Sequence, residues 1–221
     1  MRGAASVDSD IDLYALGAGP EYLLERAEPF LLSISWTTPD RIRAAFRDPL
    51  RCAGVVPGLR RALLLHDPQG TAAMLQAEAR AWTWELLDPV AIDSAVAEEL
   101  YGYAEEVQKL VANLRRGRIR VALVQRSVLA LRLARIMAAY RRLLYEAEDD
   151  LWDGIARRIG PDWERAQAAA LGEHGESPVE SCRAALGLFA LAAGELEACF
   201  NERQRAVVRH ALARAATLAE R

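Results

Sequence analysis

The chain has 221 residues, a formal net charge of −3, 52% hydrophobic residues and 27% charged residues. This length suits one large domain or two small ones with real cores, and the slightly acidic balance gives no reason to expect a nucleic-acid partner. No apolar run approaches the roughly 18 to 20 residues of a membrane helix, and no apolar stretch of a secretory signal follows Arg2. We therefore expect a cytoplasmic protein without a membrane partner.

The first 70 residues alternate between two kinds of short segment. Three apolar runs bounded by Gly, Pro or Asp have strand length, at residues 11–16, 30–36 and 62–65. Residues 20–27 look helical, and Thr38-Pro39 looks like an N-cap followed by Pro at the first position of a helix over residues 41–46. Strands that alternate with helices predict a small α/β unit.

After residue 70 the strand signals end and the sequence becomes rich in Ala, Leu, Arg and Glu. Apolar residues at helical spacing predict a succession of amphipathic helices with short connections, which is typical of a bundle. The longer predicted helices cover residues 74–87, 92–116, 119–145, 178–200 and 202–220. The predicted fold class is therefore α+β, with a small mixed sheet and helices in a domain of residues 1–70 and a helical bundle of residues 71–221.

The run from Asp8 to Leu13 carries the clearest chemical signal. Asp10 and Asp12 are two residues apart, so on a strand both carboxylates project from one face while Ile11 and Leu13 pack on the other. Two neighbouring carboxylates repel unless a cation lies between them, and Mg²⁺ takes such ligands together with substrate phosphates. We predict Asp10 and Asp12 as Mg²⁺ ligands, and Asp8 as a turn residue.

The segment with Arg2-Gly3 and Ser9-Asp10-Ile11-Asp12-Leu13 resembles the nucleotidyltransferase motif of the DNA-polymerase-β superfamily. The motif covers only residues 2–13, but the architecture over most of the chain is similar to that of small antibiotic-modifying enzymes of the kanamycin and lincosamide type. The family's Gly-Ser pair, whose loop holds the nucleotide phosphates, would precede Arg2 and is not among these residues. We therefore expect a nucleotidyltransferase-type domain that is incomplete at its N-terminus.

This resemblance implies a transferase that moves a nucleoside monophosphate, AMP from ATP, to a hydroxyl of a small acceptor such as an aminoglycoside or lincosamide. It implies Mg²⁺ as cofactor at Asp10 and Asp12, ATP as co-substrate bound with the help of Arg2 and Ser9, and a role in antibiotic resistance. A homodimer is compatible with it. The alternative is a catalytically impaired protein of the same fold that acts as an interaction partner or an antitoxin-like protein, or a helical oligomerisation module in residues 71–221.

The resemblance to kanamycin nucleotidyltransferase also suggests a catalytic pair. A helical-domain glutamate serves there as base with a lysine four residues later, and Glu105 and Lys109 have this spacing. Residues four apart share a helix face, and Glu105 and Lys109 lie opposite the apolar stripe that runs through Leu100 and Val107. Glu106 is the alternative base, and an ordinary solvent-exposed ion pair is the alternative to any catalytic role.

Other chemistry-bearing residues give weaker signals. The spacing of Cys52, Cys182 and Cys199 matches no metal motif, so we expect small buried hydrophobes in a reducing compartment. The tryptophans are expected mostly in the core. Among the arginines, Arg132 lies between Leu131 and Leu133, which favours partial burial beside a partner.

Overall fold

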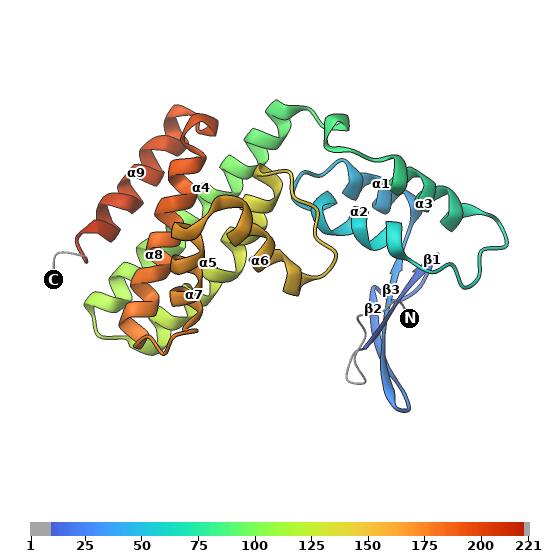
Figure 1. The fold of residues 1–221 in the computed structure, drawn as a ribbon, viewed down its shortest axis with the longest axis horizontal. Helices are drawn as coiled ribbons and strands as arrows, with labels where there is room; N and C mark the ends of the chain where they lie inside the picture. The colour runs from blue at the N-terminus through green and yellow to red at the C-terminus, as the bar shows by residue number, and fades with distance from the viewer. Residues whose placement is uncertain (1–9, 219–221) are drawn as a thin grey trace.

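The computed structural model describes residues 10–218, apart from the side chains of residues 148 and 149. Within this range the chain is α+β, with a three-stranded mixed sheet followed by a long succession of helices (Figure 1). The predicted order of a small sheet and then a helical part is confirmed. No helix in the described range has the length and apolar character needed to cross a membrane.

The sheet contains β1 (Ile11–Leu16), β2 (Tyr22–Ala27) and β3 (Phe30–Thr37) in the order β1-β3-β2. Strand β3 pairs in parallel with β1 and antiparallel with β2. No residue of these three strands is fully buried, and Figure 1 shows the sheet projecting from the helices as a narrow ribbon. The contact with the main core comes from Leu16, at the carboxyl end of β1.

The helix predicted over residues 20–27 is wrong, because this segment is strand β2. Its leucines, glutamate, arginine and alanine all tolerate a helix. However, Ala27 pairs with Phe30 across the two-residue turn Glu28-Pro29, so the segment folds back as a hairpin on β3. Pairing with a neighbouring strand outweighs a weak local helix preference here.

Helices α1 (Pro39–Phe46), α2 (Cys52–Arg61) and α3 (Thr71–Ala81) pack against one another at one end of the sheet (Figure 1). The predicted cap of α1 is confirmed, since Thr38 Oγ1 accepts a hydrogen bond from the backbone N–H of Arg41 at 3.3 Å. Arg43 on α1 binds Glu78 on α3, with Nη2 2.8 Å from Oε1.

Two other predictions fail in this region. The strand predicted at residues 62–65 is an irregular connection, and Leu63 and Leu65 are 61% and 79% exposed; an apolar run forms a strand only where another strand can pair with it. The helix predicted over residues 74–87 ends at Ala81. There the backbone of Trp82 becomes extended and its indole N–H donates to the carbonyl of Phe46 at 2.9 Å.

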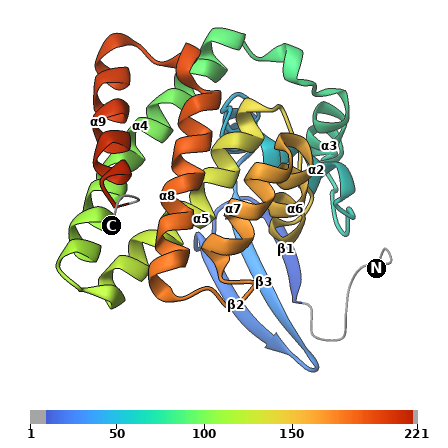
Figure 2. The same cartoon turned by 60° about the vertical axis from the view of Figure 1, so that its left-hand side comes forward.

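The remaining helices form the bundle seen in Figure 2. They are α4 (Pro89–Arg115), α5 (Ile119–Tyr140), α6 (Glu148–Ile159), α7 (Pro161–Leu171), α8 (Pro178–Glu195) and α9 (Glu202–Ala216), with short 3₁₀ turns at Trp84–Leu86 and Glu197–Cys199. The apolar stripe predicted on α4 is confirmed, because Leu100 and Val107 are fully buried. Capping by Asp88, Ser177 and Asn201 explains where α4, α8 and α9 begin.

One contiguous set of buried residues runs from α1, α2 and α3 into the bundle. The connection between α5 and α6 reaches across to α2, where the backbone N–H of Tyr145 donates to the carbonyl of Ala53 at 3.0 Å. Three of the tryptophans, Trp82, Trp84 and Trp163, are buried as expected. The division of the chain near residue 70 stays a prediction.

Helix α5 ends at Tyr140, five residues before the predicted end, because Arg142 adopts the left-handed conformation with φ of 54°. The backbone N–H of Arg142 donates to the carbonyl of Ala139, and that of Leu143 donates to the carbonyl of Ala138 at 2.8 Å. This pair of hydrogen bonds is the pattern of a Schellman motif. We expect Arg142→Gly to raise the free energy of unfolding by about 0.5–1 kcal/mol, because glycine adopts this conformation without strain. Urea denaturation measures the change.

Arg116→Gly is the matched control for this prediction, because Arg116 also follows a helix but has φ of −90°. Glycine at that position loses chain entropy without relieving strain, so stability should fall or stay unchanged. A loss of stability in Arg142→Gly would show that the arginine side chain contributes more than the strained backbone costs.

Candidate carboxylate site on the sheet

Asp12 lies within β1 and Asp10 immediately before it, and both are exposed. Exposure alternates along the strand as predicted, since Asp12 and Tyr14 are open to solvent while Ile11 and Leu13 are partly covered. Among the described residues, no ion pair joins either aspartate to a basic side chain. Within the described part of the chain, neither of these two exposed carboxylates therefore has a compensating positive charge in contact with it.

The strand register shows which side chains share this face. Ser33 is opposite Asp12, and Ser35 is opposite Tyr14 on one side and Tyr22 on the other. By the same register Leu24, Arg26 and Leu31 also project from this side of the sheet. We use the name carboxylate face for the part of it formed by Asp10, Asp12, Tyr14, Tyr22, Ser33 and Ser35. Only the aspartates were singled out from the sequence. Tyr14 could have been predicted to share this face, because it lies two residues after Asp12 on the same strand. Tyr22 could not, because its segment was predicted to be a helix.

Polar contacts link several of these residues. Ser33 Oγ donates to the hydroxyl of Tyr22 at 3.4 Å. Partial burial of its hydroxyl and the negative charge of Asp12 raise the pKa of Tyr14. The tyrosine is therefore neutral at physiological pH, and its hydroxyl lies within electrostatic reach of the carboxylate.

The donor set fits a hard divalent cation with an incomplete protein shell. Carboxylate oxygens are the ligands that Mg²⁺ prefers, and it commonly takes one or two of them while water and phosphate oxygens complete its octahedron. Among residues 10–218 there is no cluster of three or more His, Cys, Asp or Glu side chains able to hold a metal. A cation at Asp10 and Asp12 would therefore have several positions left for water or a phosphate-bearing substrate.

The topology determines where these aspartates lie in the sheet. Strand β3 leads directly into α1, and β1 runs parallel to β3. The amino end of β1, with Asp10 and Asp12, is thus at the opposite end of the sheet from α1. The carboxylate face is therefore open to solvent at its acidic end, in the part of the sheet that projects from the helices in Figure 1.

Glu105 and Lys109 form an ion-pair cluster on the exposed side of α4. Lys109 Nζ lies 3.0 Å from Glu105 Oε1 and 2.8 Å from Glu106 Oε1. Hydrogen bonds from Glu106 and then Glu105 raise the pKa of Lys109. The side chain of Glu105 is 73% exposed and that of Glu106 is 22% exposed. The local geometry is therefore that of an ordinary solvent-exposed ion pair, the alternative to a catalytic pair.

The structure does not bring this cluster to the carboxylate face. Helix α4 packs against α5, α8 and α9, and Figures 1 and 2 both show α5 and α6 between α4 and β1. The catalytic role of Glu105 and Lys109 therefore stays a prediction from the resemblance. Arg2 and Ser9, predicted to help bind the nucleotide, lie outside the described residues, as does Asp8.

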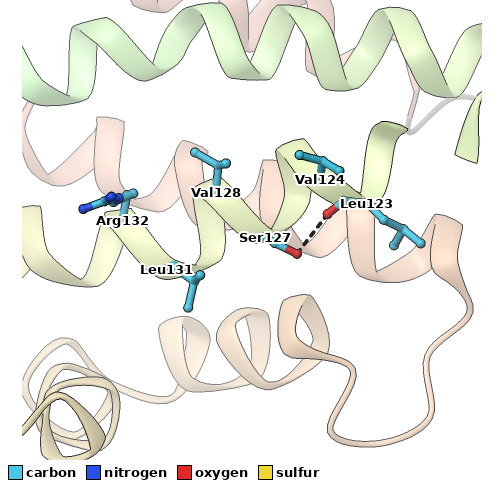
Figure 3. A pocket seen from close by; sticks show the side chains of 6 residues that line it. All are labelled: Leu123, Val124, Ser127, Val128, Leu131 and Arg132. Carbon is cyan, nitrogen blue, oxygen red and sulfur yellow. Dashed lines mark hydrogen bonds between the residues drawn. The ribbon is translucent and has the colours of Figure 1, made fainter. Parts of the chain in front are cut away.

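A shallow apolar groove lies on the outward side of α5 (Figure 3). Val124 and Val128 point toward α4, while Leu131 points away from it. Arg132 lies at one end of the groove and, contrary to the expectation of partial burial, is exposed. Burial and the nearby Glu99 raise the pKa of Tyr103 on α4, and the positive charge of Arg132 partly opposes this shift. The Tyr103 hydroxyl donates a hydrogen bond to Glu99 at 3.2 Å. The groove carries no convergent polar groups of a catalytic site.

The cysteines behave as the buried hydrophobes that were predicted. Cys52 and Cys182 are buried and Cys199 is partly buried, all as free thiols. Burial raises the pKa of Cys52 to about 12, so this thiol stays protonated at physiological pH. A protonated thiol is a poor nucleophile, since the thiolate is the reactive form.

The carboxylate face is thus the candidate site that the described residues best support. It combines metal-ligand chemistry, exposure and a defined strand register. No protein-family model and no curated protein sequence matches the chain. The residues of this face and the motif that contains its two aspartates are therefore what indicates a function.

Proposed function

We propose that the protein is a Mg²⁺-dependent nucleotidyltransferase that moves AMP from ATP to a hydroxyl of a small acceptor such as an aminoglycoside- or lincosamide-like compound. The observation that carries the proposal is that Asp10, just before β1, and Asp12, on β1, are both exposed and have no ion-pair partner among the described residues. The resemblance of residues 2–13 to the nucleotidyltransferase motif and the order of a small sheet followed by helices support it.

In this proposal Asp10 and Asp12 hold the metal ion at the edge of an exposed face where a triphosphate has room. Bound Mg²⁺ supplies charge neutralisation of the triphosphate and orientation of the reacting oxygens. The acceptor oxygen forms a bond to the α-phosphorus, the bond to the pyrophosphate oxygen breaks, and the hydroxyl proton leaves to a base. Glu105 as this base and Lys109 as the phosphate partner enter the proposal from the resemblance alone.

Pyrophosphate release tests this function directly. The purified chain is incubated with ATP, Mg²⁺ and a panel of aminoglycosides, lincosamides and simple polyols. We expect acceptor-dependent release that EDTA abolishes and added Mg²⁺ restores. No release with any acceptor, together with no Mg²⁺-dependent binding of ATP, would exclude the proposed activity for this chain.

The openness of the sheet supports a second candidate function. None of the strand residues is fully buried, and four large hydrophobic side chains on one face are about half or more exposed: Tyr14, Tyr22, Leu24 and Leu31. An exposed apolar patch of this kind marks an interaction surface in many proteins. An inactive chain whose sheet amides become protected from hydrogen exchange on binding a protein partner would favour an interaction or antitoxin-like role.

A further inference from the structure

Strand β2 has one edge that no other strand covers. The sheet order is β1-β3-β2, so β3 pairs with one side of β2, while its other side has no partner strand among residues 10–218. The register with β3 runs without a bulge from Tyr22 to Ala27, and the strand contains no proline and no lysine. Proline, lysine and bulges commonly keep an exposed edge from pairing with another chain. This edge lacks all three.

The hydrogen-bonding groups on this edge belong to alternate residues. In an antiparallel pair, every second residue bonds to the neighbouring strand, and the residues between them direct their N–H and C=O away from it. The backbone N–H of Trp36 donates to the carbonyl of Glu21 at 3.3 Å, and the same register continues along β2. The odd-numbered residues of β2 therefore bond to β3, and Tyr22, Leu24 and Arg26 present their backbone groups at the open edge.

The side chains along this edge are also open to solvent. All residues of β2 except Leu23 are exposed. Tyr22 is 56% exposed, Leu24 is 52% exposed and the side chain of Arg26 is 76% exposed. An added strand would cover the apolar surface of the tyrosine and the leucine, which is favourable, and would pair the free backbone groups at the same time.

The edge is complementary to itself in one register. When a second copy is placed antiparallel about a two-fold axis at Leu24, this leucine lies opposite its own copy and Tyr22 lies opposite Arg26. A guanidinium can stack on a tyrosine ring while its edge keeps an ion pair, and Arg26 has such a pair with Glu28 of the turn. About six backbone hydrogen bonds then join the copies. An axis at Glu25 or at Arg26 would instead bring like charges opposite each other.

We propose that β2 is a dimerisation edge, on which a second copy of this chain pairs its own β2 antiparallel about a two-fold axis at Leu24. The product is one sheet in the order β1-β3-β2-β2-β3-β1, with the helices of the two copies at opposite ends. The exposed aspartates belong to the outermost strands, so the two acidic pairs lie at least about 24 Å apart. This separation exceeds the screening length of about 8 Å at physiological salt, so their repulsion does not oppose the dimer.

Sedimentation velocity of the full chain tests this arrangement. Over roughly 1–300 µM we expect the wild type to shift from monomer to dimer, because two short strands form a small interface. Leu24→Lys places two ammonium groups opposite each other at the axis and removes an apolar contact, so the dissociation constant should rise at least about tenfold. Leu31→Lys is the matched control: Leu31 is 49% exposed on the same side of the sheet but lies on β3, and this variant should dimerise like the wild type.

Two further measurements locate the contact. With rising protein concentration, amide hydrogen exchange should slow at Leu24 and stay unchanged at Leu23 and Glu25, whose N–H groups already bond to β3. Oxidation of Leu24→Cys should give a disulfide-linked dimer, because directly opposite residues of such a pair have Cα atoms about 5.5 Å apart. Leu31→Cys should give none.

A wild-type chain that stays monomeric at the highest of these concentrations would overturn the proposal. Equal weakening of the dimer in Leu24→Lys and Leu31→Lys would do the same, because the contact would then depend on the face of the sheet and not on its edge. A series of higher oligomers, or a dimer whose exchange protection lies outside β2, would also contradict it. None of these results depends on pyrophosphate release, so the dimer and the proposed activity stand or fall separately.

Discussion

The double substitution Asp10→Asn, Asp12→Asn is expected to reduce Mg²⁺-dependent pyrophosphate release by a factor of at least about 10³. Asparagine keeps the shape of aspartate but removes the two negative charges that hold the cation. Metal stabilisation of a transferring phosphoryl group contributes several kcal/mol, and each 1.36 kcal/mol corresponds to a tenfold change in rate. Initial rates at saturating ATP and acceptor measure the effect.

Both aspartates are exposed, so the double variant should fold normally. Far-UV circular dichroism and the midpoint of urea denaturation check this point. Asp153→Asn is a matched control: its carboxylate is 78% exposed and its ion-pair contact is Arg157 on its own helix, at 4.0 Å. Full activity in the double variant would show that β1 carries no catalytic metal, whereas equal losses in the control would indicate a nonspecific charge effect.

Phe189→Ala is expected to lower the free energy of unfolding by about 3–5 kcal/mol. Phe189 lies in the middle of α8, which packs against α5 and α7, and it has no solvent exposure. Its removal loses the transfer free energy of a buried ring and leaves a cavity that rigid helices on several sides fill only in part. Urea denaturation followed by far-UV circular dichroism measures the change.

Leu131→Ala is the control for this substitution, because Leu131 lines the groove on α5 and is 47% exposed. Its effect should stay below about 1 kcal/mol. A loss of less than 1 kcal/mol in Phe189→Ala would show that the bundle repacks around the deleted ring. Such repacking is inconsistent with a well-ordered core.

The same denaturation data address the division near residue 70. The buried residues of α1, α2 and α3 are continuous with those of the bundle, so Phe189→Ala should destabilise both parts in one transition. Fluorescence of Trp36, which lies on β3, contributes a signal from residues 1–70. Two separate transitions would show that residues 1–70 and 71–221 unfold independently.

Local signals in the sequence were sufficient for most of the helices and for two of the three strands, β1 and β3. A helix start depends on a cap and the next three residues, which is why Thr38-Pro39 located α1. The buried stripe of α4 follows from a 3.6-residue period within a single element. The alternation of Asp12 with Ile11 and Leu13 likewise needs only the two-residue repeat of a strand, so the exposed carboxylate pair was predictable.

Features that depend on a distant partner were decided only by the tertiary structure. Residues 22–27 become a strand because β3 provides hydrogen-bonding partners, whereas residues 62–65 remain irregular because no strand lies beside them. Pairing of β1 and β2 with β3 is also what places Tyr14 and Tyr22 around Ser35, and packing of α4 on α5, α8 and α9 is what separates Glu105 from the aspartates. The carboxylate strand could be predicted because its aspartates alternate with apolar residues within one segment. The face around it could not be predicted, because it consists of three segments whose register is set by hydrogen bonds between them.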